Sequence, residues 1–311
     1  MKKKKEPRFF KRRRWYTPLL IKLGWVADYR RIPIFGVSGV GKSYFSFSLC
    51  QYLKTNHLGK PLGIDSRFLS GAIQAILARK KLPPSVGNRE LKLHLEKIRM
   101  EEYGKVYEDM YRQDEGMTPC RVEEPGESEE GMIPCNILIS TNDMSGTDFE
   151  NAMMQMGEPH ADVTRHPSVR RFLNVVADCD GAMVVLDLVR GREQLAKSDV
   201  IEMIRLAVAD QVIAVVNGIQ LAIENRKNGN SFFPLFLIFT KKDIYGLERD
   251  ELHPIVEEVI EPIVSNMADD IKIRSHAVTN MGFIESDRFL QDDSVGISFM
   301  LADLAVSTQS L

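Results

Sequence analysis

One stretch constrains this chain more than any other: residues 32–43, Ile-Pro-Ile-Phe-Gly-Val-Ser-Gly-Val-Gly-Lys-Ser. A short apolar run precedes the pattern Gly-x-x-x-x-Gly-Lys-Ser, and a helix-like stretch follows it, which is the context that a phosphate-binding loop requires. Glycines let the backbone fold tightly around a polyphosphate, and the following helix directs its positive N-terminal end toward the same anion. The sequence therefore predicts a nucleotide site in a strand–loop–helix unit.

The residues of this loop have different expected roles. Lys42 neutralises the outer phosphates, and the Ser43 hydroxyl is a ligand for the Mg²⁺ that accompanies them. The predicted nucleotide-binding residues of the loop are Gly36, Val37, Ser38, Gly39, Val40, Gly41, Lys42, Ser43 and Tyr44. The loop alone does not separate ATP from GTP.

Charge is unevenly distributed along the chain. Residues 1–18 carry nine Lys and Arg against one Glu, so with a net charge of −2 the remaining residues carry −10. We expect this basic N-terminal arm to be separate from a domain over 19–311. Residues 2–16 combine cations with aromatic rings, which suits an anionic membrane surface or single-stranded nucleic acid. A solvated tail that docks on the acidic body or on a partner is the other interpretation.

The composition is that of a globular protein, with 44% hydrophobic and 27% charged residues. The longest apolar run, 232–239, is far too short to span a bilayer, and no apolar signal-peptide region follows the basic N-terminus. Four widely spaced cysteines match no zinc pattern. We therefore expect reduced thiols and a cytoplasmic location, or a peripheral one at the membrane if the arm binds there.

Apolar periodicity predicts the first half of the fold. A helix is expected over Ser43–Lys54, and a helical insertion over 66–112, broken at Pro83-Pro84 and resumed as an amphipathic helix over 89–111. Two strand-like runs, Thr118–Glu123 and Met132–Thr141, flank an acidic turn-rich connection and predict a hairpin.

The second half alternates between helical and strand patterns. The expected elements are loop and helix over 148–179, a buried strand over 182–187, a helix over 198–226, a strand over 232–240, a helix over 249–268, a strand over 271–278 and a closing helix over 295–309. Strands that alternate with helices favour an α/β fold with a doubly wound, mainly parallel sheet, here with one antiparallel hairpin strand.

Three further motifs stand at predicted strand ends, where such a sheet presents its ligands. Asp143-x-x-Gly146 offers a carboxylate for Mg²⁺ and a backbone N–H for a terminal phosphate. Thr240-Lys241-Lys242-Asp243 offers a carboxylate that can accept two hydrogen bonds from guanine, with the stem of Lys241 along the base. Ser275-His276-Ala277-Val278 offers backbone N–H groups to the guanine carbonyl oxygen.

Together and in this order, these motifs resemble those of the Ras-like P-loop GTPases, within the translation-factor and Ras-related superfamily, over residues 31–309. The resemblance implies a Ras-like G domain that binds GTP and GDP with Mg²⁺. It implies nucleotide contacts from Thr240, Lys241, Asp243, His276, Ala277 and Val278. It implies Mg²⁺ ligands at Ser43, Thr118 and Asp143, with Thr118 as the switch threonine just before the hairpin. The implied catalytic residues are Lys42, Gly146 and Thr147.

The chain departs from the family pattern in several places. The insertion before the switch-one segment resembles that of some bacterial GTPases of operonic and defence-type systems. Ser38 stands where Ras has glycine, and Thr147 replaces the glutamine that orients the attacking water, which predicts slow hydrolysis. His276 replaces the usual small residue before the alanine.

The leading interpretation is a GTP-binding molecular switch with slow intrinsic hydrolysis, which regulates a protein partner through segments 113–120 and 143–165. One alternative is a nucleotide-bound interaction module that hydrolyses little. Another is an ATP-dependent P-loop kinase or ATPase in which Asp243 is only a turn residue. The sequence leaves open the effector, the activating partner and pairing into a homodimer.

Two further residue groups have competing interpretations. A cis-acting arginine could come from the group Arg165, His166, Arg170 and Arg171, for which a solvated helix face is the simpler explanation. Met153, Met154 and Met156 suit either a soft partner-binding surface or core packing.

Overall fold

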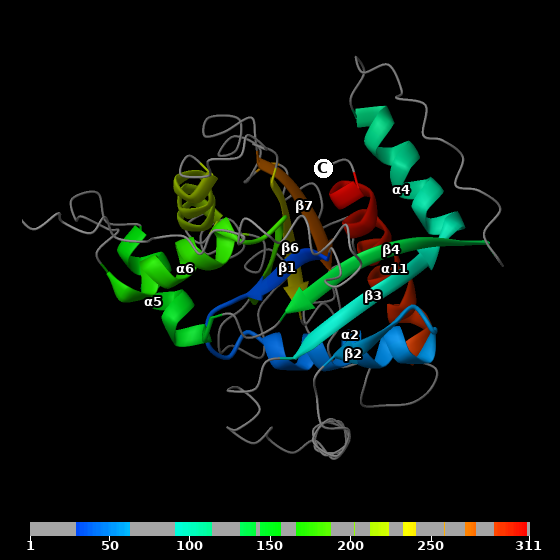
Figure 1. Ribbon diagram of the computed structural model, residues 1–311, viewed down its shortest axis with the longest axis horizontal. Coiled ribbons are helices and arrows are strands. Elements are labelled where there is room, and N and C mark those ends of the chain that lie inside the picture. The colour runs from blue at the N-terminus through cyan, green and yellow to red at the C-terminus, as the bar shows by residue number, and fades with distance from the viewer. Residues whose placement is uncertain are drawn as a thin grey trace, which may run out of the picture.

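The computed structural model describes residues 29–62, 91–113, 131–140, 144–156, 166–187, 202, 212–223, 233–240, 258, 271–277 and 289–309 (Figure 1). Its strands are β1 (Arg30–Phe35), β2 (Gly59–Leu62), β3 (Lys92–Arg99), β4 (Met132–Ser140), β5 (Ala182–Asp187), β6 (Phe233–Thr240) and β7 (Ile271–Ala277). Its helices are α2 (Lys42–Thr55), α4 (Met100–Gln113), α5 (Gly146–Met156), α6 (Pro167–Ala177), residues 212–223 and α11 (Phe289–Gln309).

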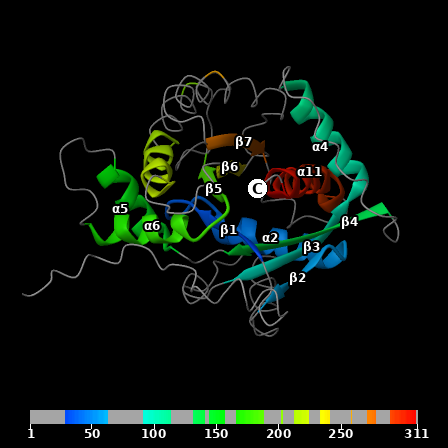
Figure 2. The ribbon, with the colours of Figure 1, turned by 45° about the horizontal axis from the view of Figure 1, so that its top comes forward.

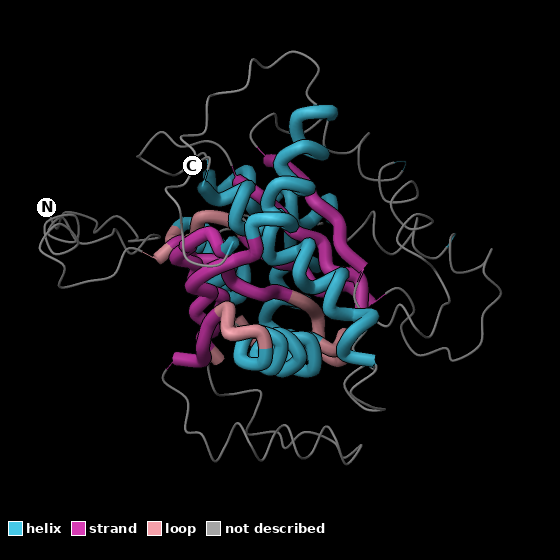
Figure 3. Tube along the Cα trace, turned by 90° about the vertical axis from the view of Figure 1, so that its right-hand side faces the viewer, coloured by secondary structure: helices cyan, strands magenta, loops and turns pink. Residues whose placement is uncertain are grey.

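The strands form one seven-stranded sheet in the order β2-β3-β4-β1-β5-β6-β7. β3 runs antiparallel to both of its neighbours, whereas β4, β1, β5, β6 and β7 are parallel. Helices pack on both sides of the strands, as the view in Figure 3 shows. The expected doubly wound, mainly parallel sheet with one antiparallel strand is therefore confirmed.

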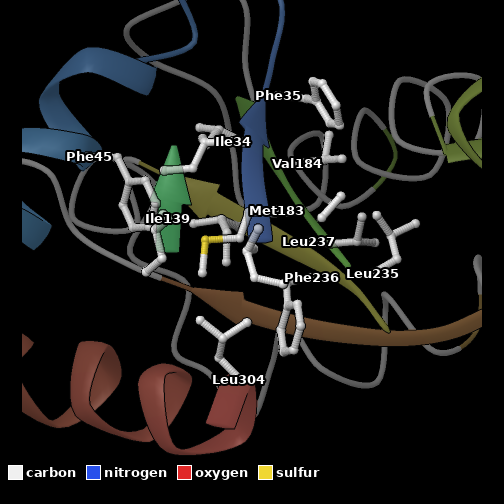
Figure 4. Packing of buried hydrophobic residues seen from close by; sticks show 14 of the residues in the cluster. Ile34, Phe35, Phe45, Ile139, Met183, Val184, Leu235, Phe236, Leu237 and Leu304 are labelled. Carbon is white, nitrogen blue, oxygen red and sulfur yellow. The ribbon is translucent and has the colours of Figure 1, made fainter. Parts of the chain in front are cut away.

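Alternation along the strands divides the core into two layers, as Figure 4 shows. The side chains that share the layer of α2 and α11 are Ile34, Met183, Phe236, Phe45 and Leu304. The side chains of the opposite layer are Phe35, Val184, Leu235 and Leu237. The central strands are therefore buried on both faces, which explains why their sequences read as continuous apolar runs.

Three phenylalanines fix α5 and α6 to the end of β1. Phe149 of α5 stacks on Phe35 with ring centroids 5.5 Å apart, and Phe172 of α6 lies 5.1 Å from Phe35 and 6.0 Å from Phe149. Because Phe35 is the last residue of β1, this group holds the first turn of α5 and the middle of α6 beside the end of that strand.

Residues 92–99 are a strand, so the helix expected over 89–111 is wrong in its first part; α4 begins only at Met100. The buried residues Leu91, Leu95 and Ile98 have helical spacing in the sequence. The alternation of β3 breaks at a bulge around Glu96 and Lys97, where the register with β4 also shifts, and this break produces the three-residue step from Leu95 to Ile98.

The turn after α2 explains this bulge and the additional edge strand β2. The carbonyl oxygen of Leu58 accepts hydrogen bonds from the backbone N–H groups of Glu96 at 2.9 Å and Lys97 at 3.1 Å. A Cβ on Gly59 would lie 2.0 Å from the carbonyl oxygen of His94, so only glycine fits at this approach. The sequence patterns did not predict β2.

The antiparallel partner of β4 is β3, which corrects the hairpin expected between Thr118–Glu123 and Met132–Thr141. Residues 118–123 lie outside the described residues. α4 follows β3 directly and packs beside α11 through Val106, Ala302 and Val306 (Figure 2). Residues 100–131 therefore connect the two antiparallel strands.

The expectations over 43–54, 182–187, 232–240 and 271–278 agree with α2, β5, β6 and β7, whereas the helix expected over 249–268 lies outside the described residues except for residue 258. The helix expected over 198–226 is present over 212–223, and α11 starts at Phe289, earlier than expected. The arm 1–18 and residues 66–90 are outside the described residues. Cys50, Cys135 and Cys179 form no disulfide with one another, and Cys120 lies outside the described residues. No helix in the described part of the chain is long and apolar enough to cross a membrane.

Candidate nucleotide site

The glycine-rich loop leaves the end of β1 and turns directly into α2. Gly39 has φ +87° and Gly41 has φ +89°, a left-handed conformation that L side chains rarely adopt. A Cβ on Gly36 would lie 2.9 Å from the carbonyl oxygen of Val185, on the neighbouring strand β5. The loop conformation therefore requires glycine for two different reasons, backbone torsion and close packing.

The N-terminus of α2 is suited to an anion. Gly41 is its N-cap residue and supplies no side-chain cap, and the first turn contains no acidic residue. The first amide groups of a helix have no partner within the helix, and the helix dipole adds positive potential there. An oxyanion held by the loop would satisfy these groups.

Lys42, the first residue of α2, brings a partly buried ammonium group to the loop. Its Nζ donates to the carbonyl oxygens of Gly36 and Met144, both at 3.4 Å. Burial lowers the pKa of Lys42 from 10.5 to about 8. Among the described residues, its hydrogen-bond partners are these two carbonyl oxygens, which carry no formal charge. A polyphosphate would supply the missing counter-charge.

The segment 144–146 packs directly on this loop. A Cβ on Gly146 would lie 2.9 Å from both the Cα and the nitrogen of Ser38. The Ser145 hydroxyl accepts a hydrogen bond from the Asp148 backbone N–H at 3.0 Å and so caps α5. Gly146 and the exposed Thr147 thus start a helix beside Ser38, and their catalytic roles stay predictions. Asp143 is outside the described residues.

Thr240 connects the loop to a distant strand end. Its buried hydroxyl lies 2.9 Å from the Val40 carbonyl oxygen and 3.3 Å from that of Leu186. Thr240 pairs with Asp187 in the sheet, and its neighbour Phe239 pairs with Ala277. The ends of β5, β6 and β7 therefore meet at the edge of the sheet that carries the loop. Sequence reasoning had placed Thr240 at the site without predicting this hydrogen bond.

Some predicted base contacts are not described. Lys241, Asp243 and Val278 are outside the described residues, and of His276 the structure describes only the backbone, in β7. Their predicted roles stay predictions.

Ser43 is the described residue suited to a hard cation. Along α2 the hydroxyls of Ser46 and Ser48 bond back to the carbonyl oxygens of Lys42 and Tyr44, at 2.7 and 2.9 Å. The Ser43 hydroxyl makes no such bond within the described part of the chain, and the residue is partly buried. Mg²⁺ bound with a nucleotide takes few protein ligands and keeps phosphates and waters, so one free hydroxyl suits it. Thr118 is outside the described residues.

The strand pairing removes the reason for choosing Thr118. The prediction of Thr118 depends on its place just before the partner strand of β4, and that partner is β3, which starts at Lys92. Lys92 pairs with Ser140 at the loop end of β4, whereas Arg99 pairs with Met132 at the far end.

The structure also separates the two ambiguous groups. Arg171 of α6 forms an ion pair with Asp148 of α5, with 2.8 Å between Nη1 and Oδ2. Met153 is buried in the core, whereas the side chain of Met154 is 66% exposed, so the methionines do not form one surface. The Arg171–Asp148 pair joins residues 23 positions apart and has no signal in the sequence.

Comparisons with known proteins give structural neighbours only. No family model matches the chain, and no curated protein matches it. One similar structure is the signal recognition particle receptor SRb-GTP/SRX complex from Chaetomium thermophilum, at 12% identity and a TM-score of 0.40, covering 87% of this chain and 99% of that one.

Two further neighbours are larger proteins. Translation elongation factor SelB from Methanococcus maripaludis, with the GTP analogue GppNHp, has 12% identity, a TM-score of 0.34 and coverage of 91% of this chain and 34% of that one. Sup35 complexed with GDP has 11% identity, a TM-score of 0.30 and coverage of 84% and 39%. Similarity at this level carries no functional conclusion, which must come from the residues of the site.

Proposed function

We propose that this chain is a GTP-binding molecular switch that slowly hydrolyses GTP to GDP and phosphate. The observation that carries the proposal is the hydrogen bond between the Thr240 hydroxyl and the Val40 carbonyl oxygen, at 2.9 Å. It fastens the start of the Thr-Lys-Lys-Asp motif to the phosphate loop. Because the motif starts beside the loop, we expect the Asp243 carboxylate, three residues later, to lie near the base of a bound nucleotide.

The phosphate end of the site works through backbone groups and one side chain. The amides of the loop and of the α2 N-terminus bind phosphate oxygens, while Lys42 neutralises their charge. Gly146 and Thr147 form the start of α5, and Gly146 packs on Ser38, so the unpaired amides of this helix start lie beside the loop. Both helices therefore favour the polyphosphate electrostatically.

A divalent cation fits the same region. Ser43 would hold Mg²⁺ through its hydroxyl, with Asp143 as the carboxylate ligand. When bound, Mg²⁺ neutralises charge on the outer phosphates. The protein residues then orient the phosphates and exclude water from them.

Hydrolysis should be slow without a partner. Thr147 is exposed at the second position of α5, and its hydroxyl is too short to orient a water and contact the phosphate together. Ser38 adds a side chain at the place where Gly146 packs. The expected rate is on the order of 10⁻⁴ s⁻¹, as for unassisted Ras-like enzymes. The same observation favours, as a second candidate, an interaction module that binds GTP and hydrolyses little.

Calorimetric titration of the purified chain with GTP, GDP and ATP, with and without Mg²⁺, tests the proposal. We expect both guanine nucleotides to bind at least about 100-fold more tightly than ATP, because adenine offers no N1–H and 2-amino pair to a carboxylate. Equal affinity for ATP would exclude the guanine assignment and favour a kinase or ATPase. Single-turnover hydrolysis with and without cell extract separates the switch from the interaction module.

The basic arm extends the proposal to location. We propose that residues 2–16 bring a cytoplasmic protein to an anionic surface, membrane or nucleic acid, while the protein partner binds near segments 113–120 and 143–165. Deletion of residues 1–18 should leave GTP affinity unchanged and abolish flotation with phosphatidylserine vesicles at low salt. If the intact protein does not float with such vesicles, the membrane version is excluded.

A further inference from the structure

The ion pair between Arg171 of α6 and Asp148 of α5 involves the first turn of α5. The first residue of that helix, Gly146, packs on the phosphate loop. Asp148 is the acidic residue of that turn, two positions after Gly146. Gly146 packs on Ser38, so the Asp148 carboxylate belongs to the turn of α5 that lies against the phosphate loop, where the proposed function places the outer phosphates. An unpaired carboxylate there would repel an added phosphate group.

The packing of α6 against α5 holds Arg171 in place. Its neighbour Phe172 packs into the group with Phe35 and Phe149, which fixes α6 beside α5. The Arg171 guanidinium then reaches Asp148 at 2.8 Å, while the Asp148 backbone N–H is bonded to Ser145. The carboxylate is therefore neutralised by α6, and the Gly146 and Thr147 amides stay available.

We infer that Arg171 is a positioning residue of the nucleotide site, which pairs with Asp148 and thereby admits a third phosphate. The inference rests on the proposed function. It assigns to Arg171 an indirect role, because its partner in the structure is a carboxylate of this chain. It predicts a selective effect on triphosphates, because a diphosphate places no charge next to the start of α5.

Affinities for a non-hydrolysable GTP analogue, GDP, tripolyphosphate and pyrophosphate, measured in Mg²⁺ buffer, test this inference. Arg171→Ala should lower the affinity for the GTP analogue and for tripolyphosphate by about 2- to 5-fold, which is the range for an exposed ion pair. The affinities for GDP and pyrophosphate should not change. Arg171→Ala combined with Asp148→Asn should restore wild-type affinity, and Arg171→Lys should restore most of it.

The matched control is a second exposed ion pair, Lys105–Glu101, with 2.7 Å between its charged atoms. It lies on α4, on the opposite side of the molecule from α5 in Figure 1. Lys105→Ala should change no affinity. Both side chains of the Arg171–Asp148 pair are substantially exposed, at 51% and 34%, so these variants should fold, which thermal unfolding checks.

The outcomes separate the two proposals. The positioning role would be overturned if Arg171→Ala lowered the affinities for di- and triphosphates equally, or if adding Asp148→Asn did not restore triphosphate affinity. Either result would leave the proposed function intact. If the wild-type chain binds tripolyphosphate but prefers no guanine nucleotide, the proposed function fails, and the selectivity for tripolyphosphate still decides the role of Arg171. Binding of neither class would overturn both.

Discussion

The two ends of the proposed nucleotide site are built in different ways. At the phosphate end, residues 36–43 form one continuous loop and helix start, which acts mainly through backbone groups. At the base end, Thr240 and Ala277 come from the ends of β6 and β7, and Thr240 lies 200 positions from its hydrogen-bond partner Val40. A site made of contiguous backbone can be recognised in a sequence, whereas a site made of distant side chains depends on the sheet that assembles it.

The largest effect is expected at the phosphate end. Lys42→Met removes the ammonium that is proposed to neutralise the outer phosphates. The affinities for GTP and GDP should fall by at least about 100-fold, or roughly 3 kcal/mol. Calorimetry measures the loss. Lys54→Met, an exposed lysine in the last turn of the same helix, is the matched control and should bind normally. Normal binding by Lys42→Met would mean that the loop does not hold phosphate.

At the base end the expected loss is smaller and specific to the base. Asp243→Asn replaces a hydrogen-bond acceptor with a donor at the base. It should weaken the binding of GTP by about 1.5–3 kcal/mol and strengthen the binding of xanthosine triphosphate. Competition between the two nucleotides measures the change. Pyrophosphate affinity serves as the internal control and should not change. An unaltered preference for GTP would remove Asp243 from the base end.

The pH dependence of stability tests the buried charge at the phosphate end. Folding lowers the pKa of Lys42 from 10.5 to about 8, so the folded protein binds this proton less tightly than the unfolded chain. The cost of burying the charge is therefore fully present below pH 8 and disappears as the pH rises toward 10.5. Between pH 7 and 9.5 the free energy of unfolding should rise by about 2 kcal/mol relative to Lys42→Met.

Denaturant unfolding of the nucleotide-free wild type and Lys42→Met across this pH range measures the difference. Other groups titrate in both proteins and cancel in the comparison. A constant difference between the two would mean that Lys42 is not desolvated in solution.

The hydrogen bond that connects the two ends should contribute less to GTP affinity than the charged groups at either end. Thr240→Val removes the hydroxyl that bonds to Val40 and leaves a buried carbonyl oxygen without that donor, which should cost about 1–2 kcal/mol in GTP affinity and in stability. Thr240→Ser keeps the hydroxyl and should behave almost as wild type. If valine and serine variants bind GTP equally well, the hydrogen bond does not couple the ends.

The smallest effect is expected for Thr118→Ala. Lys92 pairs with Ser140 next to the end of β4, so the start of β3 lies beside the phosphate end, whereas Met132 pairs with Arg99 at the far end of the strand. GTP affinity in Mg²⁺ should change by less than about 2-fold, within the range for surface substitutions. A selective loss of GTP relative to GDP would show that residues 114–130 reach the site after all.

Sequence patterns predicted one half of the sheet better than the other. β5 and β6 are buried on both faces, so their continuous apolar runs identified them directly. In β3, charged residues alternate with Leu93 and Leu95, and the bulge then moves Ile98 into a helical spacing. That bulge exists because the Leu58 carbonyl oxygen occupies two amides of β3, a contact between segments far apart in the chain.

The sequence by itself determined the phosphate loop, because left-handed glycines, an apolar strand and a helix start must be contiguous to fold around an anion. Through apolar periodicity it also determined which segments of the central part form strands and which form helices. Only the tertiary structure decided that β3 pairs with β4, that Thr240 is fastened to Val40, and that Arg171 neutralises Asp148. Each of these is a contact between side chains or strand edges far apart in the chain, whose geometry is fixed only when the sheet and its helices pack.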